Sequence, residues 1–425
     1  MIGLAVHNPS LDDEPSAASA SVLAQPLTLR SGMTLPNRLV KAAMTEGLAN
    51  RDGNPTPMHQ RLYRRWAAGG VGSMITGNVL VDRRYLERSR NVVADAAVDE
   101  DALRRFAAAC EGAPTVVQLS HAGRQTNRML ARRPVSASST SAVRKLGGFA
   151  PARALSTDEV YDVRDRFIAS AVRVVRAGFR GVQLHAAHGY LLSQFLSPAT
   201  NQRRDQYGGS LDNRARLLLE IAEGIADAMP EASIWVKVNS NDFRRGGFDE
   251  AQATAVVRWL DEAGVDVVEL SGGTYEHVAF LEPDSEKDAY FIDFARAIKR
   301  DVEVPLLLTG GFADAAAMAA AVHDGISLIG LARPLAADPE LAGALLDGSA
   351  TSAPRTAPRL PGPLADAADV GWYRLQMELY GRGRTGWVGA PSAVAAADYV
   401  LRELITAAID GPHRRRIVRR LTDGA

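Results

Sequence analysis

Eight short apolar runs alternate with helical patterns along most of the chain, and this alternation constrains the fold more than any other feature. The runs predict strands at 38–44, 72–77, 115–119, 181–184, 233–238, 266–270, 304–309 and 327–331. Helices with apolar residues at three- and four-residue spacing are predicted between them, at 157–177, 211–229, 250–263 and 313–323. Asp212 and Asp314 near helix starts, and Gly178 and Gly264 after helix ends, are the expected caps.

Eight such units predict an α/β fold, a parallel (β/α)₈ TIM barrel over residues 22–350. The alternative is a doubly wound sheet. It is less favoured because no Gly-rich dinucleotide-binding turn follows the first strand.

The remaining segments are predicted to surround this barrel. Residues 1–21 should form a mobile N-terminal arm, and 27–36 a hairpin that plugs the bottom of the barrel. A long insertion, 125–155, follows the third strand and suits a lid or a substrate-facing subdomain. A Pro- and Ala-rich linker, 351–364, leads to a C-terminal helical extension, 365–425, with helices predicted at 370–380, 391–410 and 414–421.

Charge and composition exclude several classes of function. Lys plus Arg and Asp plus Glu each number 49, so the chain has no overall field that would attract nucleic acid. The basic run 413–420 is interpreted as a solvated helix face or a subunit contact. No apolar run approaches the ~20 residues of a membrane helix, and 1–21 do not resemble a secretory signal, so a cytoplasmic protein without membrane contact is expected. Cys110, the single cysteine, is expected to be a buried structural thiol; an iron–sulfur cluster needs about four thiolates, so any electrons must travel on an organic carrier.

Polar residues follow the fourth predicted strand at the point where it should end. His185, His188 and Tyr190 would face the catalytic mouth of a barrel. The two histidines could be structural or could bind a metal, but no third ligand lies at zinc-site spacing. The preferred hypothesis is a pair of N–H donors that hold an oxyanion, with Tyr190 as a proton donor.

Other strand ends carry candidate binding groups. Lys237 would need an anionic partner inside the mouth, and the Gln118 amide suits the edge of a heterocycle. Gly310 and Gly311 after the seventh strand, with Ala332-Arg333 after the eighth, suit a phosphate site. Ala43-Met44-Thr45 ends the first strand, where an ordinary core strand end is the alternative.

Together these segments resemble the old yellow enzyme family of FMN-dependent ene-reductases over roughly residues 22–345. The resemblance rests on the order and spacing of 36–38, 42–45, 118–124, 185–190, 197–201, 204–209, 213–214, 271–273, 310–311 and 332–333. It implies FMN as cofactor, NADH or NADPH as hydride donor and an activated C=C bond, such as that of an α,β-unsaturated carbonyl, as substrate.

The resemblance also implies a role for each candidate. His185 and His188 correspond to the pair that binds the substrate oxygen, and Tyr190 to the proton donor. The flavin-ring contacts correspond to Ala43, Met44, Thr45, Gly77, Gln118 and Lys237. The FMN phosphate site corresponds to Gly310, Gly311, Ala332 and Arg333.

The chain departs from the family at several points. One branch has cysteine in place of Thr45, and Lys237 replaces an arginine common in relatives, so the flavin potential should differ. By analogy with dimeric relatives, the extension is expected to frame a substrate pocket at a subunit interface of a homo-oligomer through Trp372, Tyr373 or Arg374.

Two alternatives stay open at this point. The same flavin site could serve amine demethylation or the reduction of nitro compounds and nitrate esters. The chain could also be a non-catalytic barrel that binds a ligand or a partner.

Overall fold

The computed structural model describes residues 14–141, 148–273, 291–312, 314–353 and 365–423, and within these ranges eight parallel strands close into a barrel. The strands, in order around the barrel, are β3 (Leu39–Lys41), β4 (Ser73–Ile75), β7 (Thr115–Ser120), β10 (Gly181–Ala186), β11 (Ser233–Asn239), β12 (Val267–Ser271), β13 (Leu306–Thr309) and β14 (Leu328–Leu331), which pairs with β3. Each corresponds to one predicted strand. The (β/α)₈ prediction is therefore confirmed, and the doubly wound alternative is wrong.

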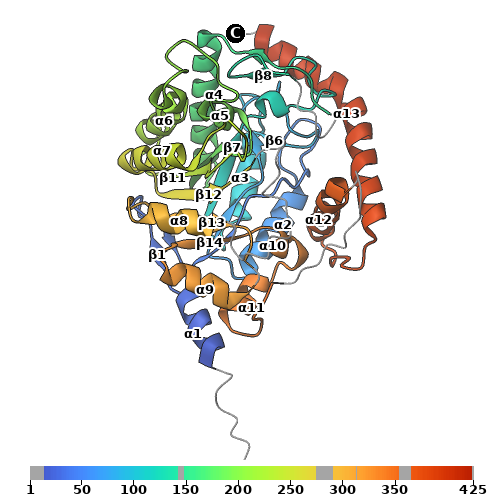
Figure 1. Ribbon diagram of the computed structural model, residues 1–425. Coiled ribbons are helices and arrows are strands. Elements are labelled where there is room, and N and C mark those ends of the chain that lie inside the picture. Colours follow the sequence, from blue (N-terminus) through green and yellow to red (C-terminus); the bar gives the residue numbers. More distant parts are fainter. Residues whose placement is uncertain (1–13, 142–147, 274–290, 313, 354–364, 424–425) are drawn as a thin grey trace, which may run out of the picture.

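Helices surround the closed sheet, and a helical extension lies along one side of it (Figure 1). The helices are α1 (Glu14–Leu23), α2 (Pro57–Ala68), α3 (Glu100–Ala108), α4 (Thr157–Arg176), α5 (Leu191–Leu196), α6 (Leu211–Ala228), α7 (Glu250–Glu262), α8 (Ile292–Lys299), α9 (Ala315–His323), α10 (Arg333–Ala337), α11 (Leu341–Leu346), α12 (Ala365–Gly381) and α13 (Ser392–Asp423). Within the described ranges, none of these is both long and apolar enough to span a bilayer.

The predicted hairpin closes the amino-terminal end of the barrel. Its strands are β1 (Leu27–Thr28) and β2 (Thr34–Leu35), and its buried side chains Leu29, Met33 and Leu35 join one apolar cluster with residues inside the barrel. The barrel members of this cluster are Val40, Ile75, Val116, Trp235, Val267, Leu307 and Leu328. The Ser31 amide donates to the Asp266 carboxylate (2.9 Å) and so ties the hairpin to the start of β12.

Two segments of the chain differ from their predictions. Residues 14–21, assigned to the mobile arm, belong to α1, which packs on α9 and α11. The helices predicted at 391–410 and 414–421 form one helix, α13, because contacts on both sides of Pro412 hold it: Arg90 pairs with Asp410 at 3.0 Å, and Arg414 donates to the Leu130 carbonyl. Residues 1–13 of the arm and 354–364 of the linker lie outside the described residues.

Short strands and the helical extension cover the carboxyl-terminal side of the barrel. The strands are β5 (Val79–Leu80), β6 (Val92–Val93), β8 (Val135–Ser136) and β9 (Arg153–Ala154), the last two within the predicted insertion, which follows the 3₁₀ turn η1 (Gly123–Gln125). Between β5 and β6, Arg88 donates to the Tyr399 hydroxyl of α13 (2.7 Å). The extension is thus docked onto the same chain's barrel.

The indole of Trp372 excludes this residue from the three that were expected to frame a substrate pocket, and leaves Tyr373 and Arg374. It is fully buried against Ala337, Ala390 and Ala395 of its own chain, so it stabilises the extension and does not line a pocket at a subunit interface.

Candidate active site

The site begins at the carboxyl end of β10, where the chain leaves the strand after Ala186. His188 has a positive φ of 58°, which non-glycine residues rarely adopt. Two side chains hold this conformation: Asn239 accepts from the His188 amide (3.0 Å), and Gln125 donates to the His188 carbonyl (2.7 Å). Backbone strain supported in this way is typical of functional sites.

The contacts of His185 determine its tautomer. Its Nδ1 accepts from the Ala187 amide (3.3 Å), so the proton of the neutral ring lies on Nε2. Burial, together with the nearby charge of Lys237, holds the pKa of His185 well below its ordinary value. His185 is therefore a neutral N–H donor at physiological pH.

His188 and Tyr190 lie against this ring. The two imidazoles are nearly perpendicular, with centroids 5.1 Å apart, and the Tyr190 ring centroid is 4.6 Å from that of His185. His188 Nε2 is 2.7 Å from the Ser271 hydroxyl. Burial, followed by the charge of Lys237, keeps the pKa of His188 well below its usual range, so this ring is neutral as well. The structure thus brings together the three predicted catalytic residues.

A polar layer lies above the apolar layer of the barrel interior. Side chains two residues apart in a strand point to the same side, so Gln118, Lys237 and Glu269 follow the inward-facing Val116, Trp235 and Val267. Lys237 Nζ lies 2.9 Å from the Glu269 carboxylate, and its side chain is only 7% exposed. The anionic partner that the sequence analysis required for Lys237 thus comes from the protein.

Several residues of this layer were not predicted. Gln183 links Gln118 to Glu269, while Asn239 and Ser271 position His188. Each of these lies two residues from an inward-facing position of a predicted strand. That period of two was the signal that could have found them.

The predicted phosphate site lies at the ends of β13 and β14. Gly310 and Gly311 have φ values of 103° and 80°, and a Cβ on Gly310 would meet no atom within 4 Å, so backbone N–H groups could face a phosphate there. The buried Thr309 hydroxyl beside them has no hydrogen-bond partner among the described residues. Arg333 is one-third exposed and 3.7 Å from Asp369 of α12. A glycine turn, an unpaired hydroxyl and an arginine fit a phosphate group.

The loop after β3 and the residue Gly77 fit the predicted flavin-ring contacts less uniformly. Ala43 packs against the interior cluster, Met44 is partly buried, and the Thr45 hydroxyl is 3.5 Å from the Glu87 carboxylate. The Gly77 amide already donates to Glu46 (3.1 Å) and Tyr63 (3.2 Å). The role predicted for Gly77 as a flavin contact therefore cannot use its N–H group.

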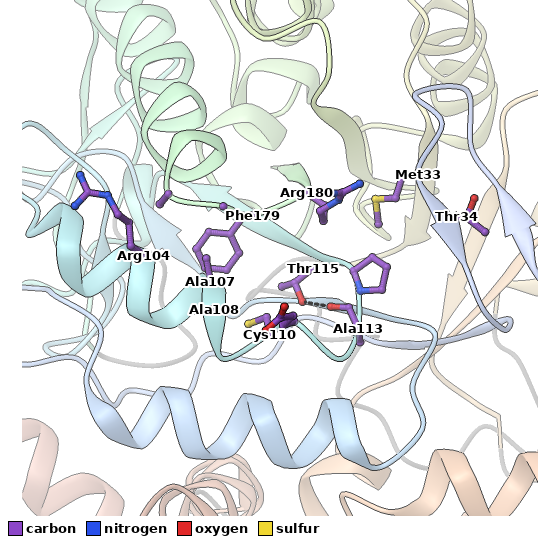
Figure 2. A pocket seen from close by; sticks show the side chains of 14 residues that line it. Met33, Thr34, Arg104, Ala107, Ala108, Cys110, Ala113, Thr115, Phe179 and Arg180 are labelled. Carbon is purple, nitrogen blue, oxygen red and sulfur yellow. Dashed lines mark hydrogen bonds between the residues drawn. The ribbon is translucent and has the colours of Figure 1, made fainter.

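A cavity of about 490 Å³ lies elsewhere in the molecule (Figure 2). Thr115 and Arg180, at the start of β7 and just before β10, line it together with Met33 of the hairpin. This is the amino-terminal end of the barrel, and none of the predicted site residues takes part. The geometry of the polar residues, and not this cavity, defines the candidate site.

A closed barrel with polar groups at the carboxyl ends of its strands has the architecture of a barrel enzyme. The chain belongs to the NADH:flavin oxidoreductase / NADH oxidase family, whose model matches residues 22–351. This family binds FMN.

Relatives and solved structures agree with this assignment. The NADH-dependent flavin oxidoreductase iliE of Hypocrea jecorina is 38% identical over 354 residues, which cover 74% of this chain and 86% of that protein. The NADH-dependent flavin oxidoreductase nadA of Aspergillus parasiticus is 34% identical over 435 residues, covering 95% of this chain and 94% of that protein. The old yellow enzyme homologue from Zymomonas mobilis has the same fold, with a TM-score of 0.68 at 24% identity over 77% of this chain and 93% of that chain. The resemblance to the old yellow enzyme family is confirmed.

Proposed function

We propose that this flavin oxidoreductase is an ene-reductase, which adds hydride and a proton across a C=C bond conjugated to a carbonyl or a related group. The cluster of His185, His188 and Tyr190 beside Lys237 carries this proposal. It combines neutral N–H donors with a phenol at the carboxyl ends of neighbouring barrel strands.

The two histidines would bind the carbonyl oxygen of the substrate. His185 offers its Nε2 proton, because Nδ1 is occupied by a backbone amide. Neutral donors polarise a carbonyl without presenting a full charge to the unreacted substrate, and their hydrogen bonds strengthen as negative charge develops on the oxygen. The depressed pKa of both rings thus suits them for this role.

Tyr190 would supply the proton. Hydride adds to the β carbon of the alkene, the electron pair moves towards the oxygen held by the histidines, and the α carbon takes a proton from the Tyr190 hydroxyl. The phenol is 3% exposed and lies at the amino terminus of α5, so α5 fixes its position next to the histidines.

The remaining groups would hold FMN. Gln118 and Lys237 would contact its ring, Ala43, Met44 and Thr45 would flank the ring, and Gly310, Gly311, Ala332 and Arg333 would hold the phosphate. When bound, FMN supplies hydride chemistry between NADH or NADPH and the alkene. The NADH-dependent relatives support the choice of a nicotinamide donor.

The Tyr190→Phe variant tests this function. In anaerobic stopped-flow experiments on the FMN-loaded enzyme, oxidation of the reduced flavin by 2-cyclohexenone is expected to slow by about 10²–10⁴-fold, the range for loss of a general acid. Reduction of the flavin by NADH should change little, because no tyrosine proton enters that half-reaction.

The matched control is Tyr161→Phe on the outer helix α4, which removes a hydroxyl that accepts from Gln206 (2.7 Å). It should leave both half-reactions unchanged. Equal slowing of both half-reactions in Tyr190→Phe, or a wild-type protein that does not take up FMN, would contradict the proposal.

A further inference from the structure

Four buried side chains form a continuous chain of polar contacts across β7, β10, β11 and β12. Gln118 donates to Gln183 (2.7 Å), and Gln183 donates to one oxygen of Glu269 (2.7 Å). The other carboxylate oxygen lies 2.9 Å from Lys237 Nζ. Gln183 and Glu269 are fully buried, and Gln118 is 2% exposed, so each contact is shielded from water.

The carboxylate fixes the direction of this chain. An ionised carboxylate only accepts hydrogen bonds, so Gln183 must turn its NH₂ group towards Glu269 and its carbonyl towards Gln118. Gln118 must then donate its NH₂ group to Gln183. Its carbonyl oxygen is left at the opposite end, as an acceptor for another donor.

The same carboxylate also opposes the charge of Lys237. Its second oxygen has no well-aligned hydrogen bond, and the contact with the ammonium is an ion pair between two almost fully buried groups. In surroundings of low dielectric constant, a neighbouring carboxylate cancels much of the field of a cation. A group close to Lys237 therefore experiences less positive potential than the lysine alone would create.

We infer that Glu269 is a positioning residue of the cofactor site, which orients the Gln118 amide, holds the Lys237 ammonium and keeps the flavin potential low. This inference rests on the proposed roles of Gln118 and Lys237 as flavin contacts. A correctly oriented Gln118 carbonyl accepts from an N–H group on the ring edge. The paired Lys237 stabilises negative charge on the reduced ring less than an unpaired lysine would.

The Glu269→Gln variant tests this inference, because it keeps the shape of the side chain and removes its charge. With FMN bound, the ratio of reduced to oxidised flavin at a fixed potential should rise about tenfold, which is a positive shift of about 30 mV for a two-electron couple. The measurement is anaerobic equilibration with a reference dye, followed by absorbance. FMN should also dissociate more readily, because the Gln118 amide can then turn either way.

Asp266→Asn is the matched control. It removes a buried carboxylate from the residue before β12, at the hairpin end of the barrel, where its partners are Ser31 and Ser233. Its flavin potential should equal that of the wild type. If Glu269→Gln leaves the potential unchanged, or if Asp266→Asn shifts it equally, the inference is overturned.

A second variant and the wild-type enzyme show which of the two proposals a negative result would refute. Should Glu269→Gln fail to fold, Glu269→Asp withdraws the carboxylate by one methylene while keeping its charge. A rise of about threefold in the same ratio is then expected, and no rise would overturn the inference. A wild-type enzyme that binds FMN and reduces enones while Glu269→Gln shows no shift would refute only the role of Glu269, whereas failure of the wild type to bind FMN would refute the proposed function as well.

Discussion

At the scale of single residues, the carboxyl ends of the barrel strands carry imidazoles that are held without charge. His185 and His188 have pKa values well below normal, and burial lowers the pKa of His121 to about 4. The His121 Nδ1 atom accepts from the Gly123 amide (3.0 Å), while its Nε2 lies 4.0 Å from Asp82. All three rings are therefore neutral in the folded protein under conditions in which the unfolded chain would protonate them.

This difference predicts loss of stability in mild acid. Above pH ~6.5, histidines are neutral in both states and contribute no pH dependence. As the pH falls below that value, the histidines of the unfolded chain bind protons. The same histidines in the folded state stay neutral until the pH reaches their lowered pKa. The free energy of unfolding should therefore fall between pH 6.5 and 5, approaching about 1.4 kcal/mol per pH unit for each such histidine once its unfolded form is charged. Urea unfolding across this range measures the slope.

Two variants test which histidines cause this dependence of stability on pH. His121→Gln should reduce the slope by about 1.4 kcal/mol per pH unit, which is the contribution of one histidine. His323→Gln, which replaces an exposed histidine in the last turn of α9, should leave it unaltered. A wild-type slope of zero in this range would show that the rings ionise in the folded state.

At the scale of elements, the β1–β2 hairpin is part of the barrel core. Leu35 is fully buried in the cluster that fills the amino-terminal end of the barrel. We expect Leu35→Ala to lower the free energy of unfolding by 2–5 kcal/mol, about the usual cost of such a cavity. Thr28→Ala, on the exposed side of the same hairpin, should change it by less than about 0.5 kcal/mol. Equal effects in denaturant titrations would mean that the hairpin is not packed into the barrel.

The elements also show where sequence patterns succeed and fail. The eight barrel strands were predictable because each is a short apolar run between helical patterns. β5 and β6 have two residues each and carry no periodicity of their own. Pro412 disfavours a continuous helix because proline lacks an amide donor. Tertiary contacts at Asp410 and Arg414 outweigh that local preference, and no pattern within the helix encodes them.

At the scale of the whole molecule, both apolar packing and polar contacts hold the extension to the barrel, and Met377 and Tyr380 of α12 belong to the main core cluster. Arg88 donates to the Tyr399 hydroxyl (2.7 Å) and lies 5.2 Å from the centroid of its ring. We predict that Tyr399→Phe removes about 1 kcal/mol from the docking of α13. Hydrogen exchange of the α13 amides should then become faster, while the barrel strands keep their protection.

Val400→Ala provides the comparison for this experiment. Val400 neighbours Tyr399 in α13 and is 40% exposed, so its truncation should leave exchange in α13 nearly unchanged. If Tyr399→Phe also left the exchange unchanged, the Arg88 contact would not hold the extension.

The site was predictable to the extent that its chemistry appears at strand ends. His185, His188, Tyr190 and Lys237 follow or close apolar runs, and the structure gathers them. Glu269 was not identified, because a carboxylate within an apolar run can belong to either face of a strand. Only the closed barrel brings it to Lys237 on the neighbouring strand, since Lys237 and Glu269 are partners in the β11–β12 register.

The β1–β2 hairpin closes the amino-terminal end of the barrel. Among the described residues, Leu29, Met33 and Leu35 pack against the apolar side chains that fill the barrel interior, so a small molecule would reach the polar layer from the end that carries the histidines. In the proposed reaction, the electron donor and the electron acceptor would therefore approach the cofactor from the same end of the barrel.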